Sequence, residues 1–278
     1  MPFVDLHLHS TCSDGSDPPE TVAARAKAAG AVAIALTDHD TMAGVPAARA
    51  AAEALGLGYI SGVEISAGFE GREIHVIGLG LDHEDTGLVS ALEALRAARD
   101  SRGRLILARL AELGVGLPAF EIGPVDSGSA LGRMHIAQAM AERGYVKQVQ
   151  EAFDRYLNPG RPAFVPKETI PLAASIDLIH GAGGLAFLAH PGLGNWVRKA
   201  LPALLAFPFD GIEAYHVSHS PGRTEGFLAL ARERGLLVTG GSDCHGTIKG
   251  KALLGSVQTP ERVFAAIMAR LRSGLLAE

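Results

Sequence analysis

Short runs of Val, Ile and Leu alternate along the chain with longer Ala-rich stretches. Such short apolar runs are typical of buried strands, and the amphipathic stretches between them are typical of helices that cover a sheet. Helices are expected over 19–30 and 43–56; both end at a glycine, and the first has a proline near its start. Strands with helical crossovers predict a parallel α/β barrel or a closely related layered fold. The seven expected strands cover 3–8, 32–36, 59–63, 73–79, 185–188, 211–214 and 236–239.

The stretch from 88 to 165 has a different pattern, with helical periodicity and no strong strand signal. Helical segments are expected over 88–114 and 135–157, and the sequence NPGRPAFVP that follows indicates a return loop. We therefore expect a helical insertion or cap over residues 88–165, set into a catalytic barrel built from residues 1–87 and 166–278.

The composition is that of a globular chain, because 47% of the 278 residues are hydrophobic and 20% are charged. The sequence has no basic start followed by an apolar segment and no uninterrupted run of 18 apolar residues, so we expect a cytoplasmic protein without a membrane partner. Two distant cysteines cannot form a disulfide framework, which fits a reducing compartment. No sequence feature points to an obligate protein partner.

The net charge of −5 argues against a broad electrostatic grip on duplex nucleic acid, which needs clustered Lys and Arg. The sequence also shows no basic stripe with interleaved aromatic residues that would guide a long single strand. A small anionic substrate is compatible with the acidic chain, because bound divalent metals would reverse the local field.

Titratable residues concentrate at the ends of the expected strands. His7 and His9 alternate on the first strand, so their side chains face the same side, about 7 Å apart along the strand. The C-terminal ends of parallel barrel strands form one face of the barrel, and active sites lie there. We therefore expect one site to gather the polar residues near the other strand ends, namely Asp14, Asp38, His39, Asp40, Glu64, His75, His190, Glu213, His216, Asp243 and His245.

This set has the chemistry of a metal site rather than of a nucleophilic triad, since imidazole and carboxylate ligands suit Mn²⁺, Fe²⁺ or Zn²⁺. Nine of the residues are candidate ligands, which is too many for one ion. At about three protein ligands for each catalytic ion they would serve two or three ions, and Glu64 on a central strand is the best bridging carboxylate. The nine are His7, His9, Asp14, His39, Glu64, His75, His190, Asp243 and His245.

The motifs DLHLHSTCSDG, TDHD, GVEIS, IHVIG, AHP and SDCH occur in this order and resemble the motif set of the PHP (polymerase and histidinol phosphatase) family of trinuclear metal phosphoesterases. The resemblance covers roughly residues 3–80 and 184–250, and no ligand position is vacant, which argues against an inactive metal-binding or polymerase-accessory module. It implies a distorted seven-stranded β/α barrel with three divalent ions, Mn²⁺ first, with Fe²⁺ or Zn²⁺ as alternatives. The implied ligands are His7, His9, Glu64 and Asp243 for one ion, Glu64, His75 and His190 for the second, and Asp14, His39 and His245 for the third.

The compact layout with a helical insertion after the fourth strand resembles the family branch that includes 3′,5′-nucleoside bisphosphate phosphatases and short-RNA 5′-exonucleases. This implies a phosphomonoesterase that removes the 3′-phosphate of a nucleoside 3′,5′-bisphosphate by attack of a metal-bridging hydroxide, with Asp14 and Glu64 among its catalytic residues. The alternatives are a 5′-3′ exonuclease on short single-stranded RNA or DNA and a histidinol-phosphate-type phosphatase. The expected partner is thus a small phosphorylated nucleotide or a short single-stranded oligonucleotide.

Residues outside the ligand set are expected to supply a proton and to bind substrate. His216, three residues after Glu213, is the candidate general acid, with a metal-bound water as its rival. The insertion offers cations for a second phosphate or a sugar, with a solvated helix face as the alternative interpretation. The candidates for substrate binding are Arg99, Arg102, Arg104, Arg133, His135 and Asn195.

Three carboxylates and three further histidines have less specific interpretations. Asp38 and Asp40 are expected to be partners of metal-bound histidines, turn formers or ligands. Glu213 is expected to be such a partner or a polar lining residue. The remaining histidines are interpreted as surface or helix residues, namely His83, His180 and His219.

Overall fold

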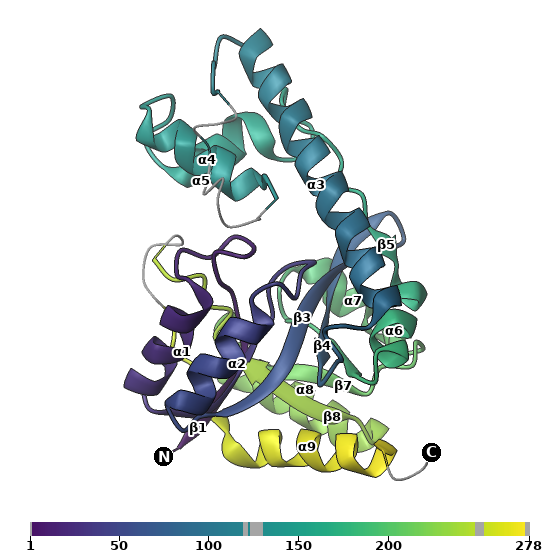
Figure 1. Ribbon diagram of the computed structural model, residues 1–278. Coiled ribbons are helices and arrows are strands. Elements are labelled where there is room, and N and C mark those ends of the chain that lie inside the picture. Colours follow the sequence, from purple (N-terminus) through teal and green to yellow (C-terminus); the bar gives the residue numbers. More distant parts are fainter. Residues whose placement is uncertain (1, 119–121, 123–129, 248–252, 276–278) are drawn as a thin grey trace. The chain divides into compact units, whose positions relative to one another are not determined.

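The computed structural model describes residues 2–118, 122, 130–247 and 253–275 (Figure 1). The chain divides into two compact units, the first made of Met1–Ala91 and Ile170–Glu278 and the second of 92–169. The sequence pattern puts the corresponding boundaries four residues earlier, at 87/88 and 165/166. The independence of the two units as domains stays a prediction.

One nine-stranded sheet forms the first unit, with strand order β8-β7-β6-β4-β3-β2-β1-β9 and with β5 paired to β3. All seven strands expected from the hydrophobic runs are present, and β5 and β9 add two residues each. Parallel pairing joins β1 to β2 and β2 to β3, and separately joins β6 to β7 and β7 to β8. The strands are β1 (Phe3–Leu8), β2 (Ala31–Leu36), β3 (Gly58–Phe69), β4 (Arg72–Leu79), β5 (Ile170–Pro171), β6 (Leu185–Leu188), β7 (Gly211–His216), β8 (Leu237–Gly241) and β9 (Thr259–Pro260).

The fourth strand runs antiparallel to both of its neighbours, so the barrel is not uniformly parallel, and this is part of the distortion that was expected. Only Glu70 and Gly71 separate β3 from β4, and their φ angles of 49° and 72° lie in the left-handed region of a tight hairpin turn. A two-residue link cannot make a crossover, so β4 returns alongside β3. This reversal puts His75, near the start of β4, at the edge where the parallel strands end.

Hydrogen bonds between β1 and the segment after β8 close the sheet into a barrel. The Asp243 N–H donates to the His7 carbonyl, and the His9 N–H donates to the Cys244 carbonyl, both at 3.0 Å. A Cβ at Gly241 would lie 2.5 Å from the His7 backbone nitrogen, so this close approach requires glycine. The distorted β/α barrel expected from the sequence is therefore confirmed.

Helices cover the outside of this sheet, and Figure 1 shows α1 and α2 side by side on it. Because side chains alternate along a strand, Val4 and Leu6 of β1 pack with Ile267 of α9, whereas Asp5 and His7 take the opposite face. Burying a side chain such as Leu6 stabilises the fold by about 1.5–3 kcal/mol, and this anchors the polar face of β1. The helices of this unit are α1 (Pro19–Ala28), α2 (Val45–Ala54), α6 (Leu172–Gly181), α7 (Asn195–Leu204), α8 (Pro221–Arg234) and α9 (Glu261–Leu275).

The second unit is helical in its described part. Its core contains Ile106, Leu110, Ile136 and Met140. The helix expected over 135–157 is interrupted at Gly144, whose φ of 74° is typical of a helix end. None of the helices within the described ranges has the length and apolar character needed to cross a membrane. The elements are α3 (Thr86–Glu112), which begins in the first unit, α4 (Arg133–Glu142), α5 (Val149–Ala152) and the π-helical turn η2 (Phe153–Leu157).

Candidate metal centre

Glu64, on β3, is almost completely buried and lies among five histidines. Its Oε1 lies 2.9 Å from His75 Nδ1 and 2.9 Å from His190 Nε2. Its Oε2 lies 3.0 Å from His39 Nδ1. The two oxygens of one carboxylate thus face different histidines, as a carboxylate that bridges two ions requires.

The two histidines of β1 face the same carboxylate. Glu64 Oε2 lies 3.3 Å from His7 Nε2 and 3.4 Å from His9 Nε2. Asp243, just beyond β8, places its Oδ1 3.7 Å from His7 Nε2 and 3.2 Å from His9 Nε2. Barrel closure therefore completes this group, because it brings the segment after β8 against β1.

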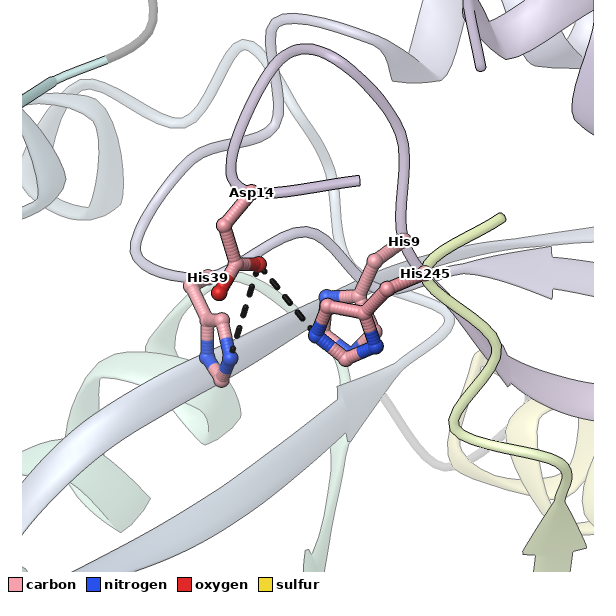
Figure 2. A group of neighbouring side chains, drawn as sticks. All are labelled: His9, Asp14, His39 and His245. Atoms are coloured by element: carbon pink, nitrogen blue, oxygen red, sulfur yellow. Dashed lines mark ion pairs between the residues drawn. The ribbon is translucent and has the colours of Figure 1, made fainter. Parts of the chain in front are cut away.

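A further group forms around Asp14, in the loop after β1. Figure 2 shows the Asp14 carboxylate reaching toward the rings of His39 and His245. Its Oδ1 lies 3.3 Å from His245 Nε2 and 3.9 Å from His39 Nε2. The His9 ring stacks on the His245 ring with centroids 4.0 Å apart. Ligand atoms of these four residues all lie within 4.8 Å of one another.

Buried polar atoms without partners provide a test of whether metal ions fit. Among the described residues, His7 Nε2, both ring nitrogens of His9, His39 Nδ1 and Glu64 Oε2 make no hydrogen bond. Leaving such an atom unsatisfied costs about 1–3 kcal/mol. Ligand atoms bound to one ion at about 2.1 Å lie roughly 3–3.5 Å apart, and the separations of 2.9 to 3.9 Å in this cluster are close to that range. The imidazole and carboxylate groups present therefore fit divalent metal ions.

Electrostatics favour the metal-binding protonation states of the carboxylates and of two histidines. Burial opposes ionisation of the carboxylates, but the histidines around them hold the pKa values of Glu64, Asp14 and Asp243 well below the usual range. Burial lowers the pKa of His9 to about 4 and that of His39 well below its usual value. For two other histidines, the neighbouring carboxylates outweigh burial, so that the pKa of His7 lies well above its usual value and that of His75 is raised to about 10. Ionised carboxylates and neutral imidazoles are the forms that coordinate metal ions.

Asp38 and Asp40 hold the loops that carry the candidate ligands. Asp38 accepts hydrogen bonds from the Ser10 N–H at 2.7 Å and from the hydroxyls of Ser10 and Ser13 at 2.6 and 2.5 Å. Asp40, with a left-handed φ of 53°, accepts from the Ser66 N–H at 2.7 Å and from the Ser66 hydroxyl at 2.9 Å. The bonded residues lie 25 to 28 positions away in the sequence, so these contacts join separate loops and are not the local bonds of a turn former.

Sequence reasoning missed two contacts near the cluster. Glu73 Oε1 lies 2.9 Å from His75 Nε2, and their spacing of two residues on one strand could have indicated this pairing. The interpretation of His219 as a surface or helix residue is wrong, because its ring is buried between two backbone groups. It accepts from the Gly192 N–H at 3.0 Å, and its Nδ1 is 2.9 Å from the Ala214 carbonyl.

His216, the candidate general acid, is buried at the end of β7. The Ser218 N–H donates to its Nδ1 at 3.1 Å, so the ring proton lies on Nε2 in the neutral form. That Nε2 is 3.6 Å from Asp243 Oδ2. The position is next to the cluster, and the role as general acid stays a prediction.

The candidates for substrate binding occupy both units. Arg102 is buried, and its Nε donates to the Val165 carbonyl at 2.9 Å. Arg104 is exposed and pairs with Asp100 at 2.9 Å. Asn195 begins α7 in the first unit, whereas the other candidates lie on helices of the second unit, namely Arg99, Arg102, Arg104, Arg133 and His135. Their contact with substrate stays a prediction.

A family model described as the PHP domain matches residues 5–158. The 3′,5′-nucleoside bisphosphate phosphatase of Chromobacterium violaceum is 33% identical over 281 residues, which cover 99% of each protein. The 5′-3′ exoribonuclease of Haemophilus influenzae is 36% identical over 245 residues, which cover 87% of this chain and 89% of that protein. A crystal structure from Bifidobacterium adolescentis, assigned as a metal-dependent phosphoesterase, has a TM-score of 0.84 at 30% identity and covers 97% of this chain and 96% of that one. The chain therefore belongs to the PHP domain family and is a metal-dependent phosphoric ester hydrolase.

Proposed function

We propose that this enzyme removes the 3′-phosphate from a nucleoside 3′,5′-bisphosphate and releases the 5′-mononucleotide and inorganic phosphate. The observation that carries the proposal is the convergence of the nine candidate ligands, in a chain that aligns end to end with a bisphosphate phosphatase. The net charge of −5 favours a small phosphorylated nucleotide over a long nucleic acid, since the latter is held by clustered Lys and Arg.

Divalent ions bound in the cluster, with Mn²⁺ as first choice, would supply an activated water and positive charge for the phosphate oxygens. Glu64 joins two ligand groups, since its Oε1 faces His75 and His190 whereas its Oε2 faces the histidines of β1. Asp14 anchors a third group. The proposed groups are His7, His9, Glu64 and Asp243; Glu64, His75 and His190; and Asp14, His39 and His245.

Proton donation to the leaving alkoxide is assigned in this proposal to His216 or to solvent. The His216 ring presents Nε2 as the only nitrogen that carries a proton while Nδ1 accepts from Ser218. To act as an acid, His216 would need a second proton on Nδ1, and that proton would displace the hydrogen bond from the Ser218 N–H. Solvent is therefore the favoured proton donor in this geometry.

A second candidate function, the 5′-3′ exonuclease, is favoured by one observation. The exoribonuclease of Haemophilus influenzae has the higher identity, 36% against 33%, although over a smaller part of the chain. Both reactions cleave a phosphate ester and can use the same ligand groups, so the cluster alone supports either one. The histidinol-phosphate alternative has no comparable observation in its favour.

The deciding experiment measures products from the Mn²⁺-reconstituted enzyme on adenosine 3′,5′-bisphosphate, AMP, histidinol phosphate and a 5′-phosphorylated oligoribonucleotide. The proposal predicts the highest kcat/KM for the bisphosphate, with AMP and phosphate as products. Mononucleotide release from the oligonucleotide at an equal or higher kcat/KM would assign the enzyme as an exonuclease. Glu64→Gln is the control for contaminating phosphatases, since it removes the central carboxylate.

The role of the insertion arginines is tested separately. Arg133→Ala and Arg102→Ala are expected to raise KM for the bisphosphate more than KM for an aryl phosphate, because only the bisphosphate has a second anionic group. Arg155→Ala is a matched control, since Arg155 is an exposed arginine of the same unit that pairs with Glu151. An equal change in KM for both substrates would show that Arg102 and Arg133 do not bind the second phosphate.

A further inference from the structure

We propose that Glu213 is a positioning residue that fixes two candidate metal ligands from different strands. Glu213 lies on β7 and is completely buried. Its Oε1 lies 2.9 Å from His7 Nδ1, and its Oε2 accepts a hydrogen bond from the His190 N–H at 2.6 Å. One carboxylate thus links a ligand of β1 to a ligand that follows β6.

The contact with His7 selects the nitrogen that this residue presents to the cluster. His7 Nε2 lies 3.3 Å from Glu64 Oε2 and 3.7 Å from Asp243 Oδ1, and it makes no hydrogen bond within the described part of the chain. With Nδ1 donating to Glu213, the lone pair of Nε2 points toward Glu64 and Asp243. Metal-binding histidines commonly donate their other ring N–H to a carboxylate, which fixes the tautomer and the ring orientation.

The contact with His190 stabilises an unusual backbone conformation. His190 has a φ of 25°, which is uncommon for a residue with a side chain and is stable only when neighbouring groups hold it. Glu213 Oε2 accepts a hydrogen bond from the His190 N–H, and His219 Nε2 accepts one from the Gly192 N–H two residues later. This backbone geometry directs His190 Nε2 to Glu64 Oε1 at 2.9 Å.

Both oxygens of Glu213 must accept hydrogen bonds, because a backbone N–H and a ring N–H can only donate. Glutamine has nearly the same shape but replaces one acceptor oxygen with an NH₂ donor. Glu213→Gln therefore keeps one of the two contacts and breaks the other, without opening a cavity. The substitution tests positioning rather than packing.

Asp210 provides a matched control immediately before β7. It is also a carboxylate that contacts a histidine ring and a backbone N–H, with His180 Nε2 at 2.7 Å and the Ala186 N–H at 2.9 Å. Neither His180 nor Ala186 belongs to the candidate ligands. Asp210→Asn thus makes the same chemical change three residues earlier, immediately before the same strand.

The experiment measures Mn²⁺ affinity by competition with a chelating dye, together with the Mn²⁺ concentration that gives half-maximal turnover of an aryl phosphate. Loss of a hydrogen-bond partner of a metal ligand commonly weakens metal affinity by about 10- to 100-fold. We expect a loss of that size in Glu213→Gln, with turnover recovering at higher Mn²⁺, and wild-type affinity in Asp210→Asn. Wild-type affinity in Glu213→Gln, or an equal loss in Asp210→Asn, would overturn the proposal.

Ring ¹⁵N NMR of metal-free wild type gives a test that needs no variant to fold. His7 Nδ1 is expected to carry a proton whether the ring is neutral or cationic, and a proton found on Nε2 alone would also overturn the proposal. The inference rests on the proposed metal centre but not on the proposed substrate. A wild-type chain that binds no divalent ion would refute the metal centre itself, whereas normal wild-type binding with an unaffected Glu213→Gln would refute only the role of Glu213.

Discussion

Asp5 carries a buried carboxylate on the face of β1 that also carries His7, and its replacement by asparagine tests the electrostatics of the barrel interior. Its Oδ1 accepts from the Ser242 N–H at 2.9 Å and, more weakly, from the His7 N–H at 3.4 Å. Its Oδ2 has no hydrogen-bond partner in the described structure. Burial therefore raises the pKa of Asp5 from 3.8 to about 6.

This shift predicts a defined dependence of stability on pH. Between pH 4 and 6 the folded protein binds more protons at Asp5 than the unfolded chain does, so the stabilisation is fully present below pH 3.8 and is lost as the pH rises through 6. The shift corresponds to about 3 kcal/mol over the whole range and to about 2 kcal/mol between pH 4.5 and 7.5. Asparagine does not ionise. The free energy of unfolding of Asp5→Asn minus that of wild type should therefore rise by about 2 kcal/mol as the pH is raised from 4.5 to 7.5.

The assay is urea unfolding of both proteins in a chelator, followed by tryptophan fluorescence. The single tryptophan, Trp196, lies on α7, with the Arg72 guanidinium 5.3 Å above its ring, so its emission reports on the first unit. Glu233→Gln on the exposed side of α8 controls for loss of a surface charge. A difference between Asp5→Asn and wild type that is the same at both pH values would refute the burial argument.

Three further results are expected. Glu64→Gln should lower kcat for phosphate release by at least about 10³-fold, since the metal-dependent stabilisation of the transition state is worth several kcal/mol; near-normal turnover by the folded variant would contradict a bridging role. Dialysis against EDTA should abolish phosphate release and added Mn²⁺ should restore it, whereas activity of protein shown to be metal-free would exclude a metal-dependent reaction. Gly192→Ala should lower the free energy of unfolding by about 1–3 kcal/mol, because the new Cβ would lie 2.4 Å from the His219 ring. Gly222→Ala, where nothing lies within 4 Å, should leave the urea midpoint in place, and equal midpoints for the two alanine variants would show that the loop around residue 192 adapts.

The hydrophobic runs predicted the position of every long strand in the barrel, because a buried strand needs a continuous apolar sequence. They did not predict the direction of β4. That direction depends on Glu70 and Gly71, which form a turn too short for a crossover. The apolar run alone does not indicate whether a strand is parallel or antiparallel to its neighbour.

The candidate site could be predicted as a group, because residues at strand ends converge on one edge whatever the loops do. The partners of individual side chains could not be predicted in this way. His219 is buried because Gly192, distant in sequence, allows a close approach of backbone to ring. Glu213 contacts His7 only because the barrel closes, and no local pattern encodes that distance.

Barrel closure across β1 and the segment after β8 also sets the order in which the centre can be assembled during synthesis. In a nascent chain, His7 and His9 are synthesised long before Asp243 is translated. Pairing between such distant segments is slow, because the entropy cost of closing a large loop comes before any stabilising contact forms. Incomplete chains thus offer metal ions only scattered ligands of low affinity, and a chain truncated before Asp243 lacks the strand pairing as well as the last ligands. The proposed ligand groups are therefore complete only after Asp243 has been translated and has paired with β1.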